Sequence, residues 1–179
     1  MKFICKSILN LIGWKAVGQT NYPLKCVICV APHTSNFDLL IGLIVNTSLG
    51  RKSYFLMKKE WFFFPLGPIF RALGGIPVDR SRKSSLTEQI AEEFSKRDKF
   101  QIAITPEATR KANTDWKKGF YYIALEAKVP IVVAALDYKL KEADFKKVLI
   151  PSGDVDADMA IIKDCYKGVT ARHPEKFTL

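Results

Sequence analysis

The stretch Val30–Leu40 of this 179-residue chain reads VAPHTSNFDLL, and it is the strongest single indication of both the fold and the chemistry. An apolar strand runs into a polar turn, and a helix runs out of that turn. Pro32 ends the strand, and the polar residues that follow His33 can cap the helix. Asp38 lies five positions after this histidine. The stretch therefore predicts a histidine and a carboxylate at a strand-to-helix junction.

The spacing of His33 and Asp38 decides whether the two side chains can meet. Five helical residues turn about 500°, so the pair would not share a face if both were helical. If His33 lies just before the helix and Asp38 in its first turns, the chain can fold them together. Asp38 can then bind one ring nitrogen, which fixes the tautomer and leaves the other nitrogen as a general base. The alternative interpretation is a capped helix with an incidental histidine.

Strand and helix patterns alternate on both sides of this junction. We expect strands at 25–31, 53–57, 76–79, 100–105, 130–136 and 146–150, and helices at 2–16, 84–97, 118–128, 156–167 and before Gly50. This order is typical of an α/β fold with a mixed, largely parallel sheet flanked by helices. No linker composition divides the chain, so we expect residues 1–179 to form a single domain.

The composition indicates a folded, basic protein. The chain is 48% hydrophobic and 26% charged, with 28 Lys and Arg against 18 Asp and Glu, a net charge of +10. Such a charge attracts nucleic acid, anionic lipid or phosphorylated small molecules. The basic residues recur in small groups beside apolar ones, which favours a basic rim around an apolar groove. Nucleic-acid binding is the weakest of the three interpretations, because basic-aromatic recognition motifs are absent from the sequence.

The cysteines indicate strand core and no metal site. Cys26 and Cys29 have a metal-like spacing, but they lie within an apolar run and lack a second pair. We expect no metal ligands, no cofactor and a reducing compartment.

The N-terminal region, residues 1–18, reads as an amphipathic helix over 2–16. Phe3, Ile8 and Leu11 follow helical spacing, and Lys2 and Lys6 share the other side. The helix either packs on its own domain or lies in a membrane interface, with its C-terminal Trp and Lys near the headgroups. No segment reaches the ~18 consecutive apolar residues of a transmembrane helix.

A second apolar region runs from residue 61 to residue 70. Its two prolines and a glycine rule out a long regular helix. It is either a core loop or an exposed surface for lipid. We expect it to line an acyl groove through its aromatic residues Trp61, Phe62, Phe63, Phe64 and Phe70.

Two further strand ends carry charged residues. One leads to Arg80, and the other leads to Glu107 and Arg110. Sites in sheets of this class form where strands end and helices begin. Arg80 and Arg110 can bind a phosphate, and Glu107 can pair with an arginine or bind an acceptor hydroxyl.

Four ordered blocks resemble the glycerolipid acyltransferase superfamily, whose best-known members are 1-acylglycerol-3-phosphate acyltransferases. His33–Asp38 is similar to its His-x4-Asp block, and Gly75–Arg80 to its second block. Pro106–Arg110 is similar to its Pro-Glu-Gly-Thr-Arg block, and Val129–Val132 to its Val-Pro-Ile-Val strand. Residues 58–60 also resemble a Lys-x-Glu segment of the family, and the whole match spans about residues 26–136.

The resemblance implies an O-acyltransferase that uses acyl-CoA or acyl carrier protein as donor and a hydroxyl of a lysophospholipid-type acceptor. His33 and Asp38 would be catalytic, and transfer would be direct, since no Gly-x-Ser-x-Gly elbow exists. The acceptor and its phosphate would be bound by Lys58, Arg80, Glu107, Ala108, Thr109 and Arg110.

Two departures from the family pattern bear on the acceptor. Pro32 replaces a common asparagine, and Ala108 replaces the glycine of the third block, whose freedom to take positive φ alanine lacks. The alternatives are a different hydroxylated or amino-acid lipid as acceptor, or a noncatalytic lipid-binding protein. We expect a cytoplasmic protein that binds peripherally to the anionic inner face of the membrane.

Overall fold

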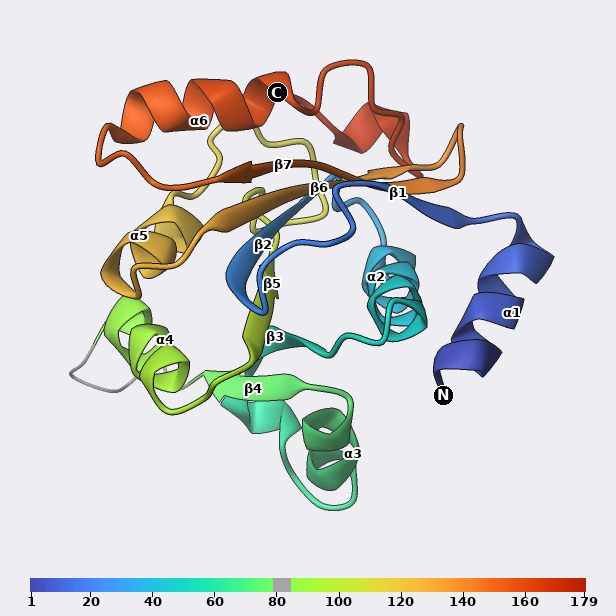
Figure 1. Ribbon diagram of the computed structural model, residues 1–179, viewed down its shortest axis with the longest axis horizontal. Helices are drawn as coiled ribbons and strands as arrows, with labels where there is room; N and C mark the ends of the chain where they lie inside the picture. Colours follow the sequence, from blue (N-terminus) through green and yellow to red (C-terminus); the bar gives the residue numbers. More distant parts are fainter. Residues whose placement is uncertain (79–84) are drawn as a thin grey trace.

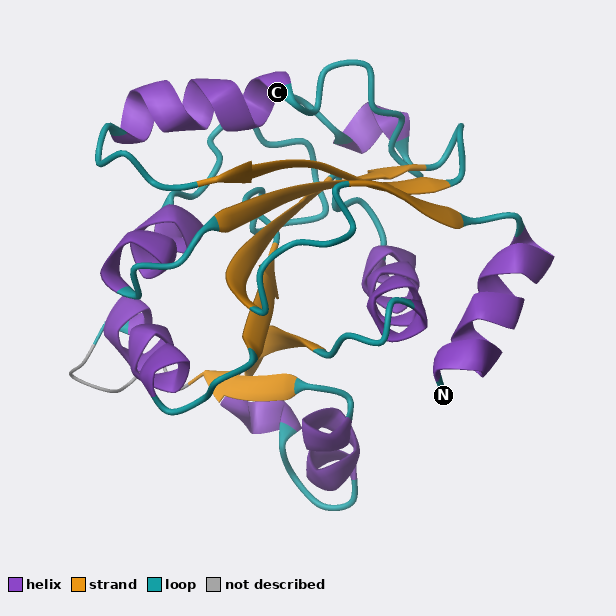
Figure 2. Cartoon of the chain, in the orientation of Figure 1, coloured by secondary structure: helices purple, strands orange, loops and turns teal. Residues whose placement is uncertain are grey.

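The computed structural model describes residues 1–78 and 85–179, whose strands form one mixed sheet with helices on both sides (Figures 1 and 2). The strands are β1 (Lys15–Gly18), β2 (Lys25–Ala31), β3 (Ser53–Lys58), β4 (Gly75–Val78), β5 (Phe100–Ile104), β6 (Ile131–Asp137) and β7 (Glu142–Leu149). The helices are α1 (Lys2–Ile12), α2 (Asn36–Ser48), α3 (Leu66–Ala72), α4 (Leu86–Ser95), α5 (Gly119–Glu126) and α6 (Val155–Asp164), with 3-10 turns η1 (Lys59–Trp61) and η2 (Pro174–Lys176).

The sheet has the strand order β1-β7-β6-β2-β5-β3-β4. Among the described strands, β6 and β7 pair antiparallel, and the other neighbouring pairs are parallel. The predicted α/β class with a largely parallel sheet is therefore confirmed. Because β2, β3, β4, β5 and β6 run in one direction, their carboxyl ends meet at one edge, where α/β proteins place their sites.

The central strand β2 is apolar on both faces because helices cover both sides of the sheet. Val27, Cys29 and Ala31 face a core that also contains buried side chains of α4, α5 and α6. Cys26 and Ile28 face a second core, formed with α1 and α2. Figure 1 shows α4 and α5 on one side of the sheet and α1 and α2 on the other. Both cysteines are fully buried, as expected for strand core.

The N-terminal helix is present but shorter than predicted. It ends at Ile12, because Gly13 adopts a left-handed conformation (φ 75°) and stops the helix. Residues 15–18 then form β1, which pairs with β7 at the edge of the sheet. Trp14 is buried against the Tyr138 ring, with ring centroids 5.0 Å apart. The interface alternative, which put this tryptophan near lipid headgroups, was therefore wrong for Trp14.

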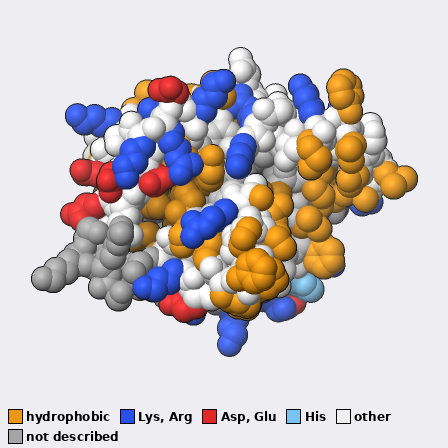
Figure 3. Space-filling model, turned by 90° about the horizontal axis from the view of Figure 1, so that it is seen from below, with side chains coloured by type: hydrophobic (Ala, Val, Ile, Leu, Met, Phe, Trp, Pro, Cys, Tyr) orange, Lys and Arg blue, Asp and Glu red, His pale blue; other side chains and the backbone are white. Residues whose placement is uncertain are grey.

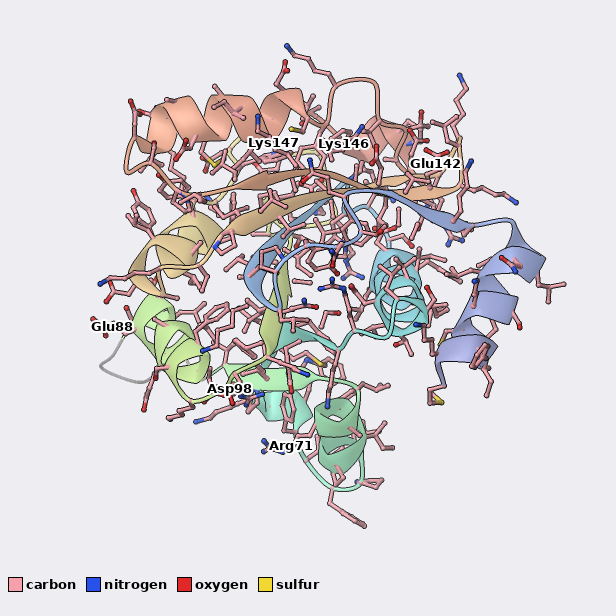
Figure 4. All side chains as sticks on the ribbon, viewed as in Figure 1. Arg71, Glu88, Asp98, Glu142, Lys146 and Lys147 are labelled. Atoms are coloured by element: carbon pink, nitrogen blue, oxygen red, sulfur yellow. The ribbon has the colours of Figure 1, made fainter. Side chains whose placement is uncertain are left out.

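Residues 59–73 form a projection beyond β4, at the bottom of Figure 1. The segment contains the short helix α3, in which Pro68 stands in the first turn, where no N–H bond is needed. Phe62 packs edge-on to Phe70. The guanidinium of Arg71, which Figure 4 labels beside α3, lies 5.1 Å from the Phe62 ring. Among the described residues, no helix is long and apolar enough to cross a membrane.

Candidate active site

The predicted meeting of His33 and Asp38 is present in the structure. His33 lies two residues before the N-cap of α2, and Asp38 is the third residue of that helix. His33 Nδ1 lies 3.3 Å from Asp38 Oδ2, with the carboxylate side chain 3% exposed and the histidine 22%. His33 lies outside the helix and Asp38 lies in its first turn, so the two residues are not both helical. Their five-residue spacing therefore brings the two side chains together.

A capping box at the start of α2 holds Asp38 in place. The Asp38 carboxylate accepts hydrogen bonds from the backbone N–H groups of Thr34 and Ser35, both at 2.8 Å. Ser35 is the N-cap, and its hydroxyl accepts the N–H of Phe37 at 3.1 Å. A negatively charged side chain is also favoured at the positive end of a helix. The turn therefore fixes Asp38 before any ligand binds.

The other oxygen of Asp38 is bonded to a residue that the sequence interpretation did not select. The Tyr138 hydroxyl donates to Asp38 Oδ1 at 2.5 Å, across 100 positions of the chain. Tyr138 directly follows β6, so it stands at the same edge as His33. The rule that strand ends form sites could have indicated Asp137 and Tyr138, the polar pair after this apolar strand.

Electrostatics keep Asp38 ionised. Burial alone would raise the pKa of this carboxyl, but hydrogen bonds from His33, Tyr138 and the Ser35 N–H outweigh it and lower the pKa below its ordinary value. If Nδ1 of His33 carries a proton for Asp38, the neutral imidazole presents Nε2 as its acceptor. In that tautomer, Nε2 of His33 is the nitrogen left to act as a base.

Glu107 lies beneath the same turn. Its carboxylate accepts the backbone N–H of His33 through both oxygens, at 3.0 and 3.1 Å, and the residue is 3% exposed. Burial is the main cause that raises the pKa of Glu107 to about 7, with a smaller contribution from the charge of Asp38. Glu107 therefore contacts the histidine backbone and lies below the surface.

The rest of the third block forms a turn after β5. Ala108 adopts φ 55°, in the left-handed region that favours glycine. Thr109 is partly buried, and its hydroxyl accepts the N–H of Lys111 at 3.3 Å. Arg110 is exposed and donates to the Asn36 side chain at the first residue of α2. The structure thus brings Arg110 close to the His33 turn.

Two other predicted phosphate ligands are placed differently. Lys58 ends β3 and is exposed, at the same edge of the sheet. Arg80 lies outside the described residues.

The C-terminal segment also reaches this turn, which no motif indicated. The N–H of His173 donates to the Thr34 hydroxyl at 3.2 Å. The Arg172 guanidinium lies 3.8 Å from the centroid of the Phe37 ring. The C-terminal segment therefore packs on the start of α2.

An apolar cavity of about 290 Å³ opens beside His33, between α2 and the strands β3 and β5. His33 and Asp38 stand among its lining residues, and apolar walls come from Leu39, Leu43, Phe55, Met57 and Ile104. The cavity has free space beside Gly42, since a Cβ atom on this residue would meet no heavy atom within 4 Å. Asn46 and Ser53, joined by a 3.2 Å hydrogen bond, add a polar part to the lining.

The residues predicted to line an acyl groove do not line this cavity. Trp61, Phe63 and Phe64 project from residues 59–73 and are 52%, 54% and 87% exposed, while Phe62 and Phe70 pack on one another. Among residues 1–78 and 85–179, no group of three or more His, Cys, Asp or Glu side chains is placed to hold a metal ion. The site therefore combines a histidine–carboxylate pair with a neighbouring apolar cavity.

Known proteins share both the sequence blocks and the fold. Residues 14–137 match the family model described as Acyltransferase. The chain is 33% identical over 136 residues to the 1-acyl-sn-glycerol-3-phosphate acyltransferase beta of Homo sapiens. This aligned region covers 73% of this chain and 48% of the human protein. It is 29% identical over 127 residues to the 1-acyl-sn-glycerol-3-phosphate acyltransferase of Saccharomyces cerevisiae, covering 66% of this chain and 41% of that one. The chain thus spans less than half the length of these curated relatives.

A solved crystal structure shares the fold of this chain. The 1-acyl-sn-glycerophosphate (LPA) acyltransferase PlsC of Thermotoga maritima superposes with a TM-score of 0.62 at 16% identity, covering 94% of this chain and 74% of that one. An α/β sheet with a His-x4-Asp turn at its carboxyl edge is the arrangement that the four blocks predicted. The chain belongs to the Acyltransferase family, and the expected likeness to glycerolipid acyltransferases is confirmed.

Proposed function

We propose that the protein is an O-acyltransferase that moves a fatty acyl group from a thioester donor, acyl-CoA or acyl carrier protein, to a hydroxyl of a lysophospholipid-type acceptor. The observation that carries this proposal is the His33–Asp38 pair at the wall of an apolar cavity. A base that faces an apolar chamber suits a substrate with a reactive polar end and an aliphatic tail. The names of the matched relatives support a 1-acylglycerol-3-phosphate-like acceptor.

In the proposed mechanism, His33 removes the proton of the acceptor hydroxyl while Asp38 holds its ring and stabilises the imidazolium that forms. The alkoxide oxygen attacks the thioester carbonyl, and the thiolate of the donor leaves and takes up a proton. Transfer is direct, with no acyl-enzyme. The N–H groups of His33, Thr34 and Ser35 already donate to the carboxylates of Glu107 and Asp38, so these three groups are not free to stabilise the oxyanion.

The cavity beside His33 is the proposed place for the acyl chain, in preference to the 61–70 projection. Its volume of about 290 Å³ suits an aliphatic tail, and its walls are mostly apolar. Arg110 is the proposed ligand of the acceptor phosphate. An arginine beside the start of α2 places a bidentate donor close to the base.

Peripheral attachment to an anionic membrane, at the inner face, completes the proposal. On α1, Phe3 is 84% exposed and Leu11 88%, and Lys2 and Lys6, on the other side of the helix, are exposed as well. The 59–73 projection adds the exposed side chains of Trp61, Phe63 and Phe64. Figure 3 shows hydrophobic side chains gathered in several places on the face of the molecule seen from below. Apolar side chains mixed with lysines are suited to the headgroup region of anionic lipid.

The test is thiol release from acyl-CoA and from acyl carrier protein with a panel of acceptors that includes 1-acylglycerol-3-phosphate. His33→Ala should lower kcat at least a hundredfold, the usual size of a lost general base. The matched control is His173→Ala, since His173 contacts the turn through its backbone N–H. Equal transfer by the wild type and His33→Ala would reject the general-base assignment.

The acceptor has its own test. Arg110→Ala should raise the KM for a phosphorylated acceptor about tenfold and leave a non-phosphorylated lipid alcohol unaffected. Lys111→Ala, an exposed neighbour, serves as the control for charge. An unchanged KM in Arg110→Ala would favour the alternative acceptors, a hydroxylated or amino-acid lipid. Absence of transfer to every acceptor, with lipid binding intact, would favour the noncatalytic alternative.

A further inference from the structure

The bond between Tyr138 and Asp38 goes beyond what the four family blocks contain. Tyr138 lies six positions after the last residue of the Val129–Val132 block. Its hydroxyl approaches the Asp38 oxygen that does not face His33. Oδ2 of Asp38 has three donors nearby, namely His33 Nδ1 and two backbone N–H groups. The Tyr138 hydroxyl is the fourth donor to this carboxylate, and it binds Oδ1.

Burial makes that donor necessary. The Asp38 side chain is 3% exposed, so water cannot readily replace the tyrosine as a partner of Oδ1. A buried carboxylate oxygen without a donor is costly, and the carboxylate can reduce this cost by rotating or by taking up a proton. Either change would weaken the contact of Oδ2 with the histidine ring.

Tyr138 itself is held from three sides. Its backbone N–H donates to the carbonyl of Thr170 at 2.9 Å. Its ring meets the buried Trp14 ring edge-on, at an interplanar angle of 83°. The preceding Asp137 binds the N–H groups of the following turn through Oδ1, at 2.9 and 3.0 Å. The hydroxyl is thus aimed at Asp38 by packing and backbone bonds, and the Arg172 side chain is the other charged group that interacts with it.

We propose that Tyr138 is a positioning residue for the histidine base: its hydroxyl holds Asp38 so that one oxygen stays on His33 Nδ1 and Nε2 remains the free nitrogen. The inference rests on the proposed function of His33. It predicts that a residue outside the four blocks sets the orientation and the basicity of the pair.

The direct test is Tyr138→Phe, which removes one oxygen atom and keeps the ring on Trp14. We expect kcat to fall about tenfold, the value of a hydrogen bond to a charged group, and the KM of both substrates to stay within about twofold. Without the tyrosine donor, Asp38 rotates or takes up a proton, so it stabilises the charged imidazole less. The acidic limb of the kcat–pH profile should therefore move to lower pH.

A matched control comes from another tyrosine–carboxylate bond. Tyr121 donates to the buried Asp158 at 2.8 Å, on the side of α5 and α6. Tyr121→Phe removes the same chemical bond at a place away from His33, so it can lower stability without moving the pH profile. If both variants change the profile equally, the positioning role of Tyr138 is rejected.

A double variant tests whether Tyr138 acts through Asp38. In an Asp38→Asn background, Tyr138→Phe should cause less than a twofold further loss, because the two side chains belong to one unit. A further tenfold loss, equal to the effect in the wild type, would overturn the inference.

A readout independent of activity separates this inference from the proposed function. Nitrogen-15 NMR of the His33 ring reports which nitrogen carries the proton. The wild type should show the Nδ1–H tautomer, and Tyr138→Phe should show a mixture of the two tautomers, whereas Tyr121→Phe should not. An inactive protein that shows this change would keep the positioning role and reject the transferase proposal. An unchanged tautomer in Tyr138→Phe would reject the positioning role.

Discussion

Replacing Glu107 by glutamine should remove a large part of the pH dependence of stability. Burial raises the pKa of this carboxyl in the folded protein from its ordinary value of 4.5 to about 7. Between these two values the folded chain holds a proton that the unfolded chain has lost, so the stability falls as the pH rises. At 1.36 kcal/mol for each pH unit, the complete loss is about 3 kcal/mol.

The assay is urea unfolding of the wild type and Glu107→Gln at pH values from 5 to 8. Glutamine keeps an acceptor oxygen for the His33 N–H but cannot ionise. The free energy of unfolding of the wild type should therefore fall by about 2 to 3 kcal/mol relative to the variant over this range, and stay level above it. Asp38, whose pKa is lowered, loses its stabilisation only at more acid pH, outside the range.

The difference between the two proteins isolates Glu107, because all other titrating groups are common to both. Glu126→Gln provides the control, since Glu126 is exposed at the end of α5 that precedes β6, at the opposite edge of the sheet from the site. This control should follow the wild-type curve. Parallel curves for wild type and Glu107→Gln from pH 5 to 8 would refute the assignment of a buried, proton-binding carboxyl.

Three further changes follow from individual residues. Ala108→Gly should raise the midpoint of thermal unfolding by about 2–4 °C, or about 1 kcal/mol, because alanine is strained at φ 55°; a lower midpoint would contradict this. Gly42→Leu should lower the rate with long acyl donors about tenfold more than with short ones, measured by thiol release, because the new side chain would enter the cavity. An equal loss for all chain lengths would place the acyl chain elsewhere. Ser35→Ala should cost about 1 kcal/mol in chemical denaturation by removing the cap of α2, and a loss below 0.3 kcal/mol would contradict the capping role.

The sequence predicted the parts of the fold that depend on local pattern. The apolar run of β2 and the polar turn after it are short-range features, so its predicted bounds, 25–31, agree with the structure. The approach of His33 to Asp38 was also predictable, because it needs one helix start and six residues. Ser35, one of the expected caps, is the residue that does it.

Features that depend on distant pairing were not predictable in this way. β1 has four residues and exists because β7 provides hydrogen-bonding partners, so a local helical pattern suggested a helix to residue 16. Gly13 was the local signal for an earlier end. Tyr138 reaches Asp38 across 100 positions, which no spacing rule contains. The cavity beside His33 lies between α2 and β3, which are placed by distant contacts. The continuous apolar run at residues 61–70 was the more visible sequence pattern, so the acyl groove was predicted there.

The capping box of α2 gives a geometric reason for the interval between the two reactive residues. Ser35 occupies the N-cap, so Asp38 falls at the third helical position and His33 falls two residues before the cap. Adding or deleting one residue between them would turn the carboxylate by about 100° around the helix axis and away from the histidine. The spacing His-x4-Asp is thus the spacing of a helix start, and a search for unrecognised relatives can require a Ser, Thr, Asp or Asn two positions after the histidine.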